Sequence, residues 1–461
     1  MAIPQKNSND NQPRKRNVGR TRMTPEGRRE QILKSAQQMF IESGLGSVRV
    51  IDIATQAGIT PAFVYHHFST KSELYQAAVR DPLEAMIKRL IVQIDELASR
   101  RTSGTDLMEE LQYVLLANMG EIGPLLSIVL FSDPEGKEFY SEFLMPKLNT
   151  SLGSLIIKIE PEARFIDVTR LMDAMFGIHF SIVLFQLFDG RGYDQSKLSR
   201  RLAALFKFGL FDEDDTQTRR ASPTTSLSLV RRDPPIPVDD DRVHVSRREV
   251  VVDAEGDRRT RLQAPERRRQ TLIAAREVFL EVGFNRARTK EIAERAGIGE
   301  PFMFRLFESK EELYRQSVEQ PLVDVVEDFR RDAIALLSGE RHGLIALEQL
   351  NQLILDTVLE ITPLVGAALL SDLSRGRILY RSDLVRIFSG LQKELGNWGS
   401  STKDGKVIMR IILGAHFGMA MAQTFGRRSL DKQDVVQWLT LLLERGLPLF
   451  PVASRNQIAI E

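Results

Sequence analysis

The sequence predicts an all-α fold in which one helical unit occurs twice along the chain. Three observations lead to this fold class. The segment that begins at Arg28 recurs, without a gap, in the segment that begins at Arg267. Apolar residues in both segments repeat with the spacing of an amphipathic helix, and Gly and Pro stand where such helices would begin or end. A chain of 461 residues is also too long for a single hydrophobic core, so more than one domain is expected.

The duplication extends well beyond the first motif. Phe40 and Phe279 are 239 residues apart, and the same spacing separates Pro124 from Pro363. Near the end of each copy, GIHFSIVLFQLF from position 177 corresponds to GAHFGMAMAQTF from position 414, at a spacing of 237. Residues 212–262 between the copies are rich in Pro, Ser, Thr, Asp and Arg without helical periodicity. They predict a flexible linker, in which VHVSRREVVV could form a short strand.

In copy 1 the order of predicted helices follows from apolar spacing and helix-ending residues. A first helix has apolar residues at positions 32, 33, 36, 39 and 40 and ends at Gly44. A second has them at positions 50, 53, 54 and 57 and ends at Gly58, where a residue with positive φ is convenient. A third, short helix follows directly, with Thr60 as its N-cap and Pro61 at its first position.

A fourth helix is predicted from a capping box that occurs in both copies. The box consists of Thr70 and Glu73 in copy 1 and of Ser309 and Glu312 in copy 2. A helix, a tight turn and a short helix with a small polar start form the plan of a helix-turn-helix DNA-binding motif. Structural αα-hairpins share this spacing, so the motif alone leaves both interpretations open.

Composition excludes several classes of protein. With 43% apolar and 27% charged residues the chain is of ordinary globular type. No apolar run approaches the roughly 18 residues of a membrane span, and the polar N-terminus lacks the apolar segment of a secretory signal, so a cytoplasmic protein is expected. The lack of cysteine excludes disulfides, thiolate metal sites and a cysteine nucleophile.

Basic residues are concentrated at the beginning of each copy. Residues 1–80 hold 12 Lys and Arg against 6 Asp and Glu, and residues 258–318 hold 14 against 9. Because the whole chain has a net charge of only +1, the remainder is acidic. Two basic segments on an acidic body suggest two polyanion-binding modules, although basic stretches are also common as plain solvated surface.

The run IL..A...F...G......IA..AGI....VY.HF..K..LY resembles the DNA-binding signature of the TetR family of bacterial regulators, and both copies match it. The resemblance implies that each copy has an N-terminal three-helix DNA-binding domain, here HTH1 and HTH2, and a C-terminal helical domain that dimerises and binds a small molecule. The expected boundaries are a basic tail at 1–24, HTH1 at 25–82, regulatory domain 1 at 83–211, the linker at 212–262, HTH2 at 263–320, regulatory domain 2 at 321–450 and a tail at 451–461.

Carried over to this chain, the resemblance places residues of the short third helix on base edges and nearby backbone, and Tyr65 and Lys71 on phosphates. The DNA-binding set predicted for copy 1 is Arg49, Thr60, Pro61, Ala62, Val64, Tyr65, His66 and Lys71. The set for copy 2 is Arg288, Gly299, Glu300, Pro301, Met303, Phe304, Arg305 and Lys310. Copy 2 departs from the family pattern, because Phe304 lacks a hydroxyl and Glu300 would repel phosphate unless it accepts from a cytosine amino group. Arg305 could compensate.

Other residues near these motifs have two interpretations each. His66 and His67 could touch DNA, or one of them could pack beneath Tyr65 at the helix end. The basic residues of the tail could reach a minor groove or phosphates, or the tail could serve only as a solubilising segment. These residues are Arg14, Lys15, Arg16, Arg20 and Arg22. The predicted core positions are Phe40, Ile53, Phe68 and Leu74, with Phe279, Ile292, Phe307 and Leu313.

The regulatory halves carry a predicted helix-pairing surface and a predicted pocket. Small residues four apart allow close helix approach, and the family places its dimer interface in the last two helices. The predicted interface is Gly177, Ser181, Gly414, Gly418 and Ala422. The predicted ligand-binding residues are Tyr113, Met172, Met175, Phe176, His179, Phe180, Met409, His416 and Met419, although such a stripe is more often plain core. No metal-ligand spacing accompanies His179 or His416, and no cofactor is expected.

These observations predict a transcriptional regulator, a repressor that binds double-stranded operator DNA and is released by a small, hydrophobic effector. An enzyme is not expected, because phosphate-binding loops, nucleophile elbows and metal constellations are absent from the sequence. A linker of about 50 residues spans around 40 Å as a flexible chain, so the two copies could pair as an intrachain pseudo-dimer on unlike half-sites. The alternatives are a dimer of chains, and a chain in which copy 2 no longer binds DNA and serves for dimerisation or effector sensing.

Overall fold

The computed structural model describes residues 24–100, 105–159, 167–190, 192–210, 264–338, 344–398, 402–426 and 428–447. Within these ranges the regular structure is helical and contains no strand, so the all-α prediction is confirmed. The basic tail before residue 24, the linker with its possible strand at 243–252 and the C-terminal tail lie outside the described residues.

Copy 1 begins with a small helical domain that is joined to the regulatory half by one continuous helical rod. The bounds of the domain and rod are α1 (Pro25–Ser47), α2 (Val50–Gln56), α3 (Pro61–His67), α4 (Lys71–Tyr75), the π-helical η1 (Gln76–Arg80) and α5 (Asp81–Ser99). The regulatory half contains α6 (Thr105–Ser132), α7 (Gly136–Glu138), η2 (Phe139–Leu144), α8 (Met145–Ile159), α9 (Val168–Asp189) and α10 (Gln195–Leu210).

Copy 2 repeats this order. Its first domain and rod are α12 (Ala264–Arg286), α13 (Thr289–Arg295), α14 (Glu300–Leu306), α15 (Lys310–Tyr314), η5 (Arg315–Glu319) and α16 (Gln320–Ser338). Its regulatory half contains α17 (Leu344–Val365), η6 (Gly366–Leu370), α18 (Leu373–Leu379), η7 (Tyr380–Leu384), α19 (Val385–Trp398), α20 (Thr402–Thr424) and α21 (Lys432–Gly446).

The local signals in the sequence act as predicted. Gly58 has a φ of +65° at the turn after α2, a conformation that favours glycine. Thr70 accepts a hydrogen bond from the backbone N–H of Glu73 at 3.0 Å, and Ser309 accepts one from Glu312 at 3.0 Å. Each serine or threonine cap thereby satisfies a backbone donor that the helix itself leaves free. Glu73 and Glu312 accept in return from the backbone N–H of Ser69 and Glu308, one residue before each cap, so the predicted boxes start both rods in a form shifted by one residue.

The core of each helix-turn-helix domain is also the predicted one. All eight positions are at most 2% exposed, namely Phe40, Ile53, Phe68, Leu74, Phe279, Ile292, Phe307 and Leu313. An aromatic pair recurs at equivalent places, with Phe40 edge-on to Tyr75 at 5.3 Å and Phe279 edge-on to Tyr314 at 4.9 Å between ring centroids. The two domains thus share one packing scheme.

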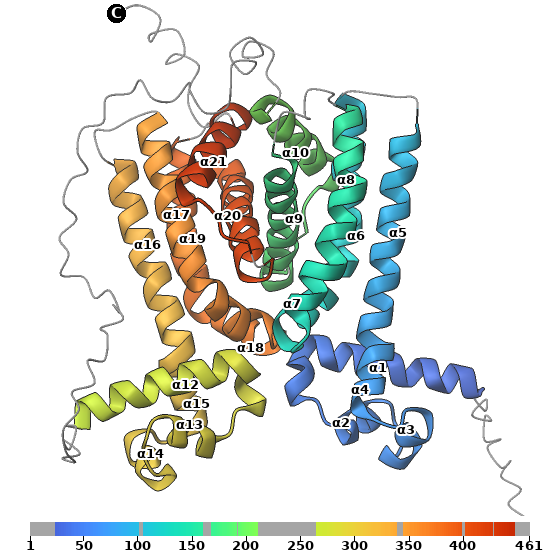
Figure 1. Cartoon of the computed structure of the whole chain (residues 1–461), viewed down its shortest axis with the longest axis vertical. Coiled ribbons are helices and arrows are strands. Elements are labelled where there is room, and N and C mark those ends of the chain that lie inside the picture. Colours follow the sequence, from blue (N-terminus) through green and yellow to red (C-terminus); the bar gives the residue numbers. More distant parts are fainter. Residues whose placement is uncertain are drawn as a thin grey trace, which may run out of the picture.

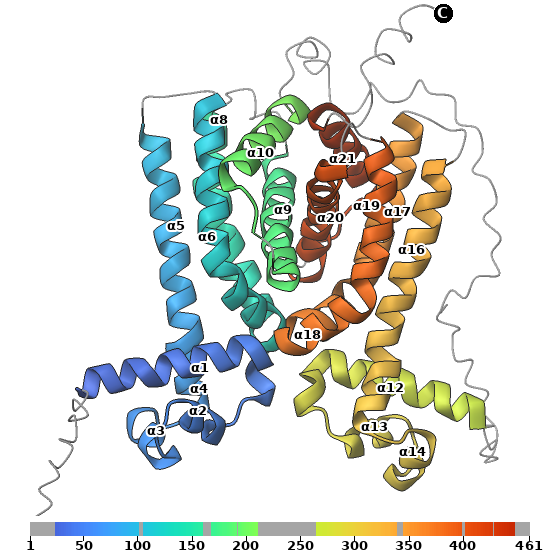
Figure 2. The same ribbon diagram turned by 180° about the vertical axis from the view of Figure 1, so that it is seen from behind.

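The two copies pack side by side around a pseudo-twofold axis. Figures 1 and 2 show α9 and α20 crossing at the centre, with α10 and α21 beside them and the rods α5 and α16 on the two outer flanks. Both helix-turn-helix domains lie at the same end of the molecule, one on each side of the axis (Figure 1). The regulatory helices therefore hold the two domains as a pair.

Four described helices are long and apolar enough to cross a membrane by length and composition, so the expectation that no such stretch exists was wrong. They span Asp106–Ser132, Val168–Asp189, Ile345–Leu370 and Gly405–Thr424. In the folded chain, 83% of the apolar window in Val168–Asp189 and 72% of that in Gly405–Thr424 is buried inside the protein. These two apolar windows form the contact between the copies. Their burial inside the protein accounts for a composition that resembles that of a membrane span.

Candidate nucleic-acid interface and regulatory cavity

The outer face of α3 forms the candidate DNA-binding surface of HTH1. Tyr65 is 52% exposed, and Ala62 and His66 are exposed on the same helix. Thr60 holds the N-cap position in an extended conformation, but its hydroxyl does not cap the helix. With Pro61 and Ala62 in the first turn, the start of α3 presents small side chains, which are suited to close approach by DNA.

Two predicted base contacts are corrected by the structure. Val64 and Met303 are each 1% exposed, and both belong to the hydrophobic core of their domains. They occupy the inner face of a two-turn helix, where the side chain at this position anchors α3 or α14 to the domain. Neither side chain can face a base edge without unfolding the helix from its core.

Phe63 was missed by the sequence prediction. It is 41% exposed on α3, and its ring lies near those of His66 and His67 at centroid distances of 6.2 and 5.1 Å. The histidines therefore cluster with Phe63 and with each other. The available signal was the helical spacing of positions 63 and 66, which places both side chains on one side of α3.

Two predicted DNA-binding cations of HTH1 already have partners within the protein. The Arg49 guanidinium binds Asp52 through Nε at 2.8 Å and Nη2 at 2.9 Å, although its side chain is 75% exposed. The Lys71 ammonium donates to the carbonyl of Leu45 at 2.6 Å. Burial, and then the charge of Arg286 from copy 2, lower the pKa of Lys71 from its ordinary value. Lys71 thus fastens α4 to the last turn of α1 and has two further N–H donors.

HTH2 offers a different surface to the same side of the molecule. Phe304 is 44% exposed where HTH1 has Tyr65, so no hydroxyl is presented there. Glu300 accepts a hydrogen bond from Thr289 Oγ1 at 2.5 Å, which draws the carboxylate toward the start of α13. Lys310 lies 4.7 Å from the centre of the Phe284 ring. The other predicted residues are exposed, namely Arg288, Gly299, Pro301 and Arg305.

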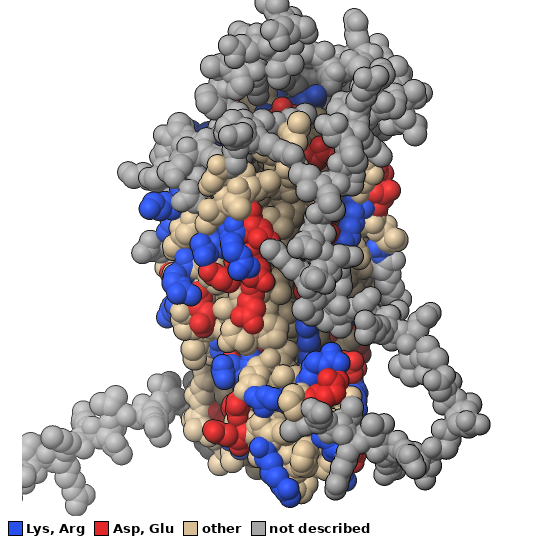
Figure 3. Space-filling model, turned by 90° about the vertical axis from the view of Figure 1, so that its left-hand side faces the viewer, with Lys and Arg blue, Asp and Glu red and all other residues tan. Residues whose placement is uncertain are grey.

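Charges on the side of copy 2 are paired rather than gathered into one basic patch. Figure 3 shows Lys and Arg interspersed with Asp and Glu over this face. In HTH2, Arg295 contacts Glu281 at 2.7 Å and Glu291 at 3.5 Å, and Arg269 contacts Glu266 at 3.0 Å. Such exposed pairs contribute little stability, but they cancel much of the positive charge that the composition suggested.

The predicted helix-pairing residues lie where α9 crosses α20. A Cβ placed on Gly177 would be 2.2 Å from the Gly414 carbonyl oxygen, and one on Gly418 would be 1.9 Å from the Asp173 carbonyl oxygen. Real side chains do not tolerate such distances, so glycine is required for the backbones to meet. Ser181 Oγ donates to the Arg410 carbonyl at 3.0 Å across the crossing.

Two equivalent histidines lie buried beside this crossing. His179 Nδ1 lies 2.7 Å from the Met175 carbonyl, and His416 Nδ1 lies 2.8 Å from the Ile412 carbonyl. Burial lowers the pKa of each histidine to about 4, so both rings are neutral at pH 7. Within the described part of the chain, no group of three or more His, Asp or Glu is placed to hold a metal ion.

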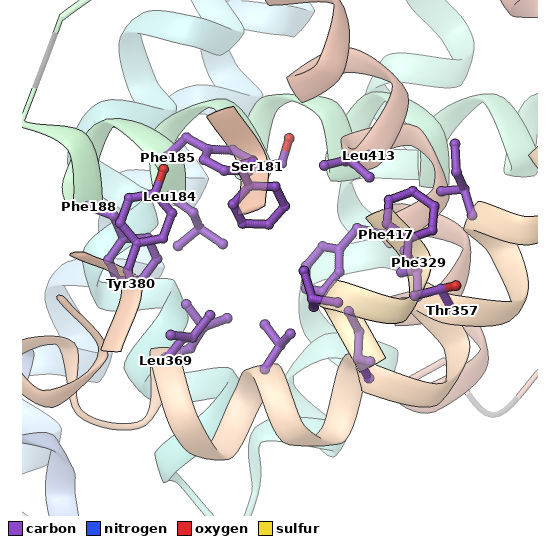
Figure 4. A pocket seen from close by; sticks show the side chains of 17 residues that line it. Ser181, Leu184, Phe185, Phe188, Phe329, Thr357, Leu369, Tyr380, Leu413 and Phe417 are labelled. Atoms are coloured by element: carbon purple, nitrogen blue, oxygen red, sulfur yellow. The ribbon is translucent and has the colours of Figure 1, made fainter. Parts of the chain in front are cut away.

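A cavity of about 130 Å³ lies in copy 2 and is closed on one side by copy 1. Figure 4 shows Phe185 and Phe188 of α9 together with Tyr380 on one side of it, and Phe329 and Phe417 of copy 2 on the other. Its remaining walls are Ser181, Leu184, Val326, Ile354, Thr357, Val358, Ile361, Val365, Leu369, Leu370, Phe388, Leu413 and Phe417.

The polar side chains in this wall are already satisfied within the protein. Thr357 Oγ1 donates to the Leu353 carbonyl at 2.8 Å, and the Tyr380 hydroxyl donates to Asp189 Oδ1 at 2.7 Å. Ser181 is bonded across the helix crossing. Because no lining hydroxyl needs a new partner, the cavity suits a neutral apolar group, and its volume matches a group about the size of benzene.

None of the nine predicted ligand-binding residues lines this cavity. Eight of them are at most 5% exposed and pack into the helix crossing or the cores, while Tyr113 is 44% exposed at the surface. The apolar stripe on α9 was assigned to a pocket, but α9 uses it against α20. The cavity forms instead between the last turns of α9 and helix α17 of the other copy. No local sequence pattern predicts which residues meet there, because this depends on how the two copies pack.

The short helix α18 connects the cavity wall to both helix-turn-helix domains. Leu370 and Tyr380, which line the cavity, flank α18 at its two ends. On its outer side, Ser374 Oγ donates to Glu42 of HTH1 at 2.8 Å, and Arg377 also binds Glu42. Arg375 binds Glu319 at 2.7 Å and lies over the Phe284 ring of HTH2. A cleft of about 400 Å³ lies beside it and is lined by residues of both domains.

The fold and these surfaces define a DNA-binding protein with two helix-turn-helix domains held as a pair by helical regulatory halves. A family model described as "Bacterial regulatory proteins, tetR family" matches residues 32–78 and again residues 272–316. The chain thus carries the DNA-binding domain of this family of transcriptional regulators twice.

Two curated relatives and one solved structure give the extent of the similarity. The HTH-type transcriptional activator FasR of Mycolicibacterium smegmatis is 43% identical over 92 residues, which are 20% of this chain and 42% of that protein. The HTH-type transcriptional repressor KstR2 of the same organism is 36% identical over 75 residues, which are 16% of this chain and 37% of that protein. The matches thus span less than half the length of these relatives.

A solved Clostridium perfringens protein, named for the regulation of fatty acid metabolism, is 18% identical and covers 38% of this chain and 95% of its own, with a TM-score of 0.32.

Proposed function

We propose that one chain acts as a pseudo-dimer on an operator whose two half-sites differ. The observation that carries this proposal is the placement of α3 and α14 at the same end of the molecule, on either side of the pseudo-twofold axis (Figure 1). Symmetric helix-turn-helix dimers read two equal half-sites about 34 to 36 Å apart. Here the two short helices carry PAFVYHH and EPFMFRL, so equal half-sites are not expected.

The test combines the mass of the free protein with its footprint. Light scattering should give 52.3 kDa, the mass of one chain, and footprinting should show one asymmetric protected site. Tyr65→Ala should weaken binding to all operators about equally and reduce its salt dependence, because phosphates carry no sequence information. A stable two-chain particle on a long inverted repeat, or unchanged affinity in Tyr65→Ala, would overturn the proposal.

A second candidate is that only HTH1 binds DNA specifically and that copy 2 serves for pairing and sensing. It is favoured by Glu300, which puts an acidic residue in the first turn of α14, and by Phe304 in place of a tyrosine. Scrambling each half of the footprint separately distinguishes the candidates. Two functional domains require that both changes weaken binding by roughly 1–3 kcal/mol per altered base pair, whereas only one change matters if HTH2 is silent.

We further propose that the regulator is a cytoplasmic repressor released by a small apolar effector in the cavity of copy 2. A ligand that enlarges the cavity would displace η6 and η7 and with them α18, which lies between these two segments. Helix α18 binds Glu42 of HTH1 through Ser374 and contacts HTH2 through Arg375. The effector can release DNA only by the difference in its affinity for the two arrangements. Since the named relatives include an activator and a repressor, a reporter gene must establish the direction of regulation.

Leu413→Phe tests the cavity with a residue that the chain already uses. Phe176 stands at the equivalent position of copy 1, 237 residues earlier. The larger ring should fill the cavity, abolish binding of benzene-sized apolar probes and leave operator binding intact. Lys432→Gln, on the surface of α21, is the control and should change neither property. If Leu413→Phe still binds such probes at the original affinity, the effector site lies elsewhere.

A further inference from the structure

The helices α9 and α20 are equivalent in the duplication, but their crossing is not symmetric in charge. Asp173 of α9 corresponds to Arg410 of α20 at the spacing of 237 residues. Arg428 of copy 2 binds Asp173, and Arg410 of copy 2 binds Asp189 of copy 1 at 2.5 Å. Every carboxylate in these two pairs comes from copy 1 and every guanidinium from copy 2.

Each pair has one nearly buried member, while the side chain of Arg428 is 40% exposed. The side chain of Asp173 is 3% exposed and that of Arg410 is 11% exposed. Arg410 also lies 5.3 Å from the centre of the Phe185 ring, and Asp189 accepts a further hydrogen bond from Tyr380. A buried charge whose partner is removed is strongly destabilising, so these groups discriminate between pairing partners far more than surface charges do.

The crossing is asymmetric in shape as well. Gly418 of α20 faces the Asp173 carbonyl, where a Cβ would be only 1.9 Å from the oxygen. The equivalent residue of α9 is Ser181, which faces the Arg410 carbonyl and has room to donate its hydroxyl to it at 3.0 Å. One side of the crossing therefore requires glycine, while the other accommodates serine.

Pairing two α9 helices from different chains would meet both obstacles. Ser181 would replace Gly418, and its Cβ would overlap the Asp173 carbonyl. Asp189 would replace Gly426 and would bring a second carboxylate toward Asp173. The sequence has Arg191 at the position equivalent to Arg428, which could offset that charge, so the steric obstacle is the stronger one.

Pairing two α20 helices would meet an electrostatic obstacle. Arg410 would face Arg428 of the other helix, and Gly426 would stand where Asp189 supplies the carboxylate. By contrast, the neighbouring contact of α10 with α21 is symmetric: Gly209 packs on Leu442 just as Gly446 packs on the equivalent Leu205. The α10 and α21 contact therefore does not distinguish like from unlike pairs, whereas the central pair of helices does.

We propose that the α9 and α20 faces accept only each other, so that copy 1 pairs with copy 2 and neither copy pairs with its own kind from a second chain. Steric overlap at Ser181 excludes one like pair, and the unpartnered arginines Arg410 and Arg428 exclude the other. The proposal rests on the pairing of copies in the proposed function, but on no DNA contact. The crosslinking test of pairing can therefore give a negative result in a protein that binds its operator, and a positive result in one that does not.

The absence of cysteine makes the pairing directly measurable in the full chain. Phe180 and its equivalent Phe417 stack across the axis at 6.4 Å between ring centroids, so single cysteines there report which copies meet. With a short thiol crosslinker, Phe180→Cys plus Phe417→Cys should link copy 1 to copy 2. Phe180→Cys or Phe417→Cys alone should give no link between chains. Links between chains from either single variant, in an otherwise unchanged protein, would overturn the proposal.

Two substitutions should convert the excluded pairs into permitted ones. Arg410→Asp supplies a carboxylate for Arg428 of a second chain and opposes Asp189, so crosslinks between chains through Phe417→Cys should rise at least about tenfold. Ser181→Gly removes the overlap between two α9 helices and should do the same for Phe180→Cys. Lys432→Asp, a charge reversal on the surface of α21, is the control and should produce none.

Light scattering of Arg410→Asp and Ser181→Gly with both phenylalanines intact guards against effects of the cysteine substitutions on folding. Both proteins should form two-chain particles, while Lys432→Asp should stay at the mass of the unchanged protein. If neither variant forms two-chain particles and neither yields crosslinks between chains, charge and shape at this crossing do not select the partner.

Discussion

The two regulatory halves make the same contact with opposite charges. In copy 1, Arg80 at the end of η1 binds Glu135 at 2.9 Å; in copy 2, Glu319 at the end of η5 binds Arg375 at 2.7 Å. Arg80 and Glu319 are equivalent at the spacing of 239, and their partners lie at the start of the next helix, Glu135 just before α7 and Arg375 in the first turn of α18. The comparison teaches that the copies kept their geometry while their chemistry diverged, and that residues changed together with their partners.

The largest expected effect on stability is at Gly418, and Gly120, a helical glycine with open space around it, provides the comparison. Gly418→Val places a branched side chain where a Cβ is 1.9 Å from the Asp173 carbonyl oxygen, so we expect a loss of more than about 3 kcal/mol in unfolding free energy. Gly120→Ala in α6 meets nothing within 4 Å and should stabilise the chain by about 1 kcal/mol through helix propensity. Urea unfolding measures both. Equal effects of the two changes would refute the close crossing.

The equivalent buried histidines of the two copies, His179 and His416, should both reduce the stability of the folded chain in acid. Because burial lowers the pKa of His179 and His416 to about 4, the unfolded chain binds protons at these residues between pH 6.5 and 4 while the folded chain does not. Their contribution is intact above pH 6.5 and is lost as the pH falls, by roughly 3 kcal/mol for each histidine. His416→Gln should reduce the slope of unfolding free energy against pH, and the exposed His66→Gln should leave it unchanged.

The reversed ion pair can be exchanged between copies. Glu319→Arg alone should cost about 1–3 kcal/mol, because it leaves Arg375 facing a like charge in a partly buried site. Adding Arg375→Glu gives an ion pair with the charges reversed and should restore part of the loss, although the contact of Arg375 with the Phe284 ring is not replaced. Thermal unfolding of the single and double variants gives the coupling. A double variant no better than the sum of its parts would show that the pair is not a unit.

The smallest expected effect concerns one hydroxyl. Phe304→Tyr gives HTH2 the residue that HTH1 has, and a new hydrogen bond to a phosphate should tighten operator binding by about 1 kcal/mol, or fivefold. Tyr65→Phe should weaken binding by a similar factor. Mobility shifts at fixed salt measure both, and no change in either protein would remove these two positions from the DNA contacts.

Local signals were sufficient to predict much of the fold. Gly58, the capping box at Thr70 and the apolar spacing around Phe40 each depend on residues close in sequence, and each is found as expected. The same kind of reasoning failed for Val64 and Met303, because a helix of seven residues must anchor itself with a side chain in its middle. Sequence spacing alone did not distinguish that inner face from the outer one.

The cavity could not have been predicted from either copy alone. Its wall joins Phe185 and Phe188 of copy 1 to Phe329 and Tyr380 of copy 2, residues whose proximity depends on the crossing angle of α9 and α20. A stripe such as Met172 and Phe176 has the same composition as a pocket wall, but it is used for packing. Apolar pattern predicts burial, whereas an empty space depends on where packing is incomplete.

If one chain binds its operator as proposed, the unlike surfaces of α3 and α14 give the molecule a direction along DNA. A symmetric dimer can turn end for end on its operator without changing the complex, whereas a chain with PAFVYHH on one side and EPFMFRL on the other cannot. Each operator then fixes which copy lies upstream, and therefore on which side of the promoter the cavity of copy 2 is located. Inverting such an operator in place would present the opposite flank of the same protein to the transcription machinery.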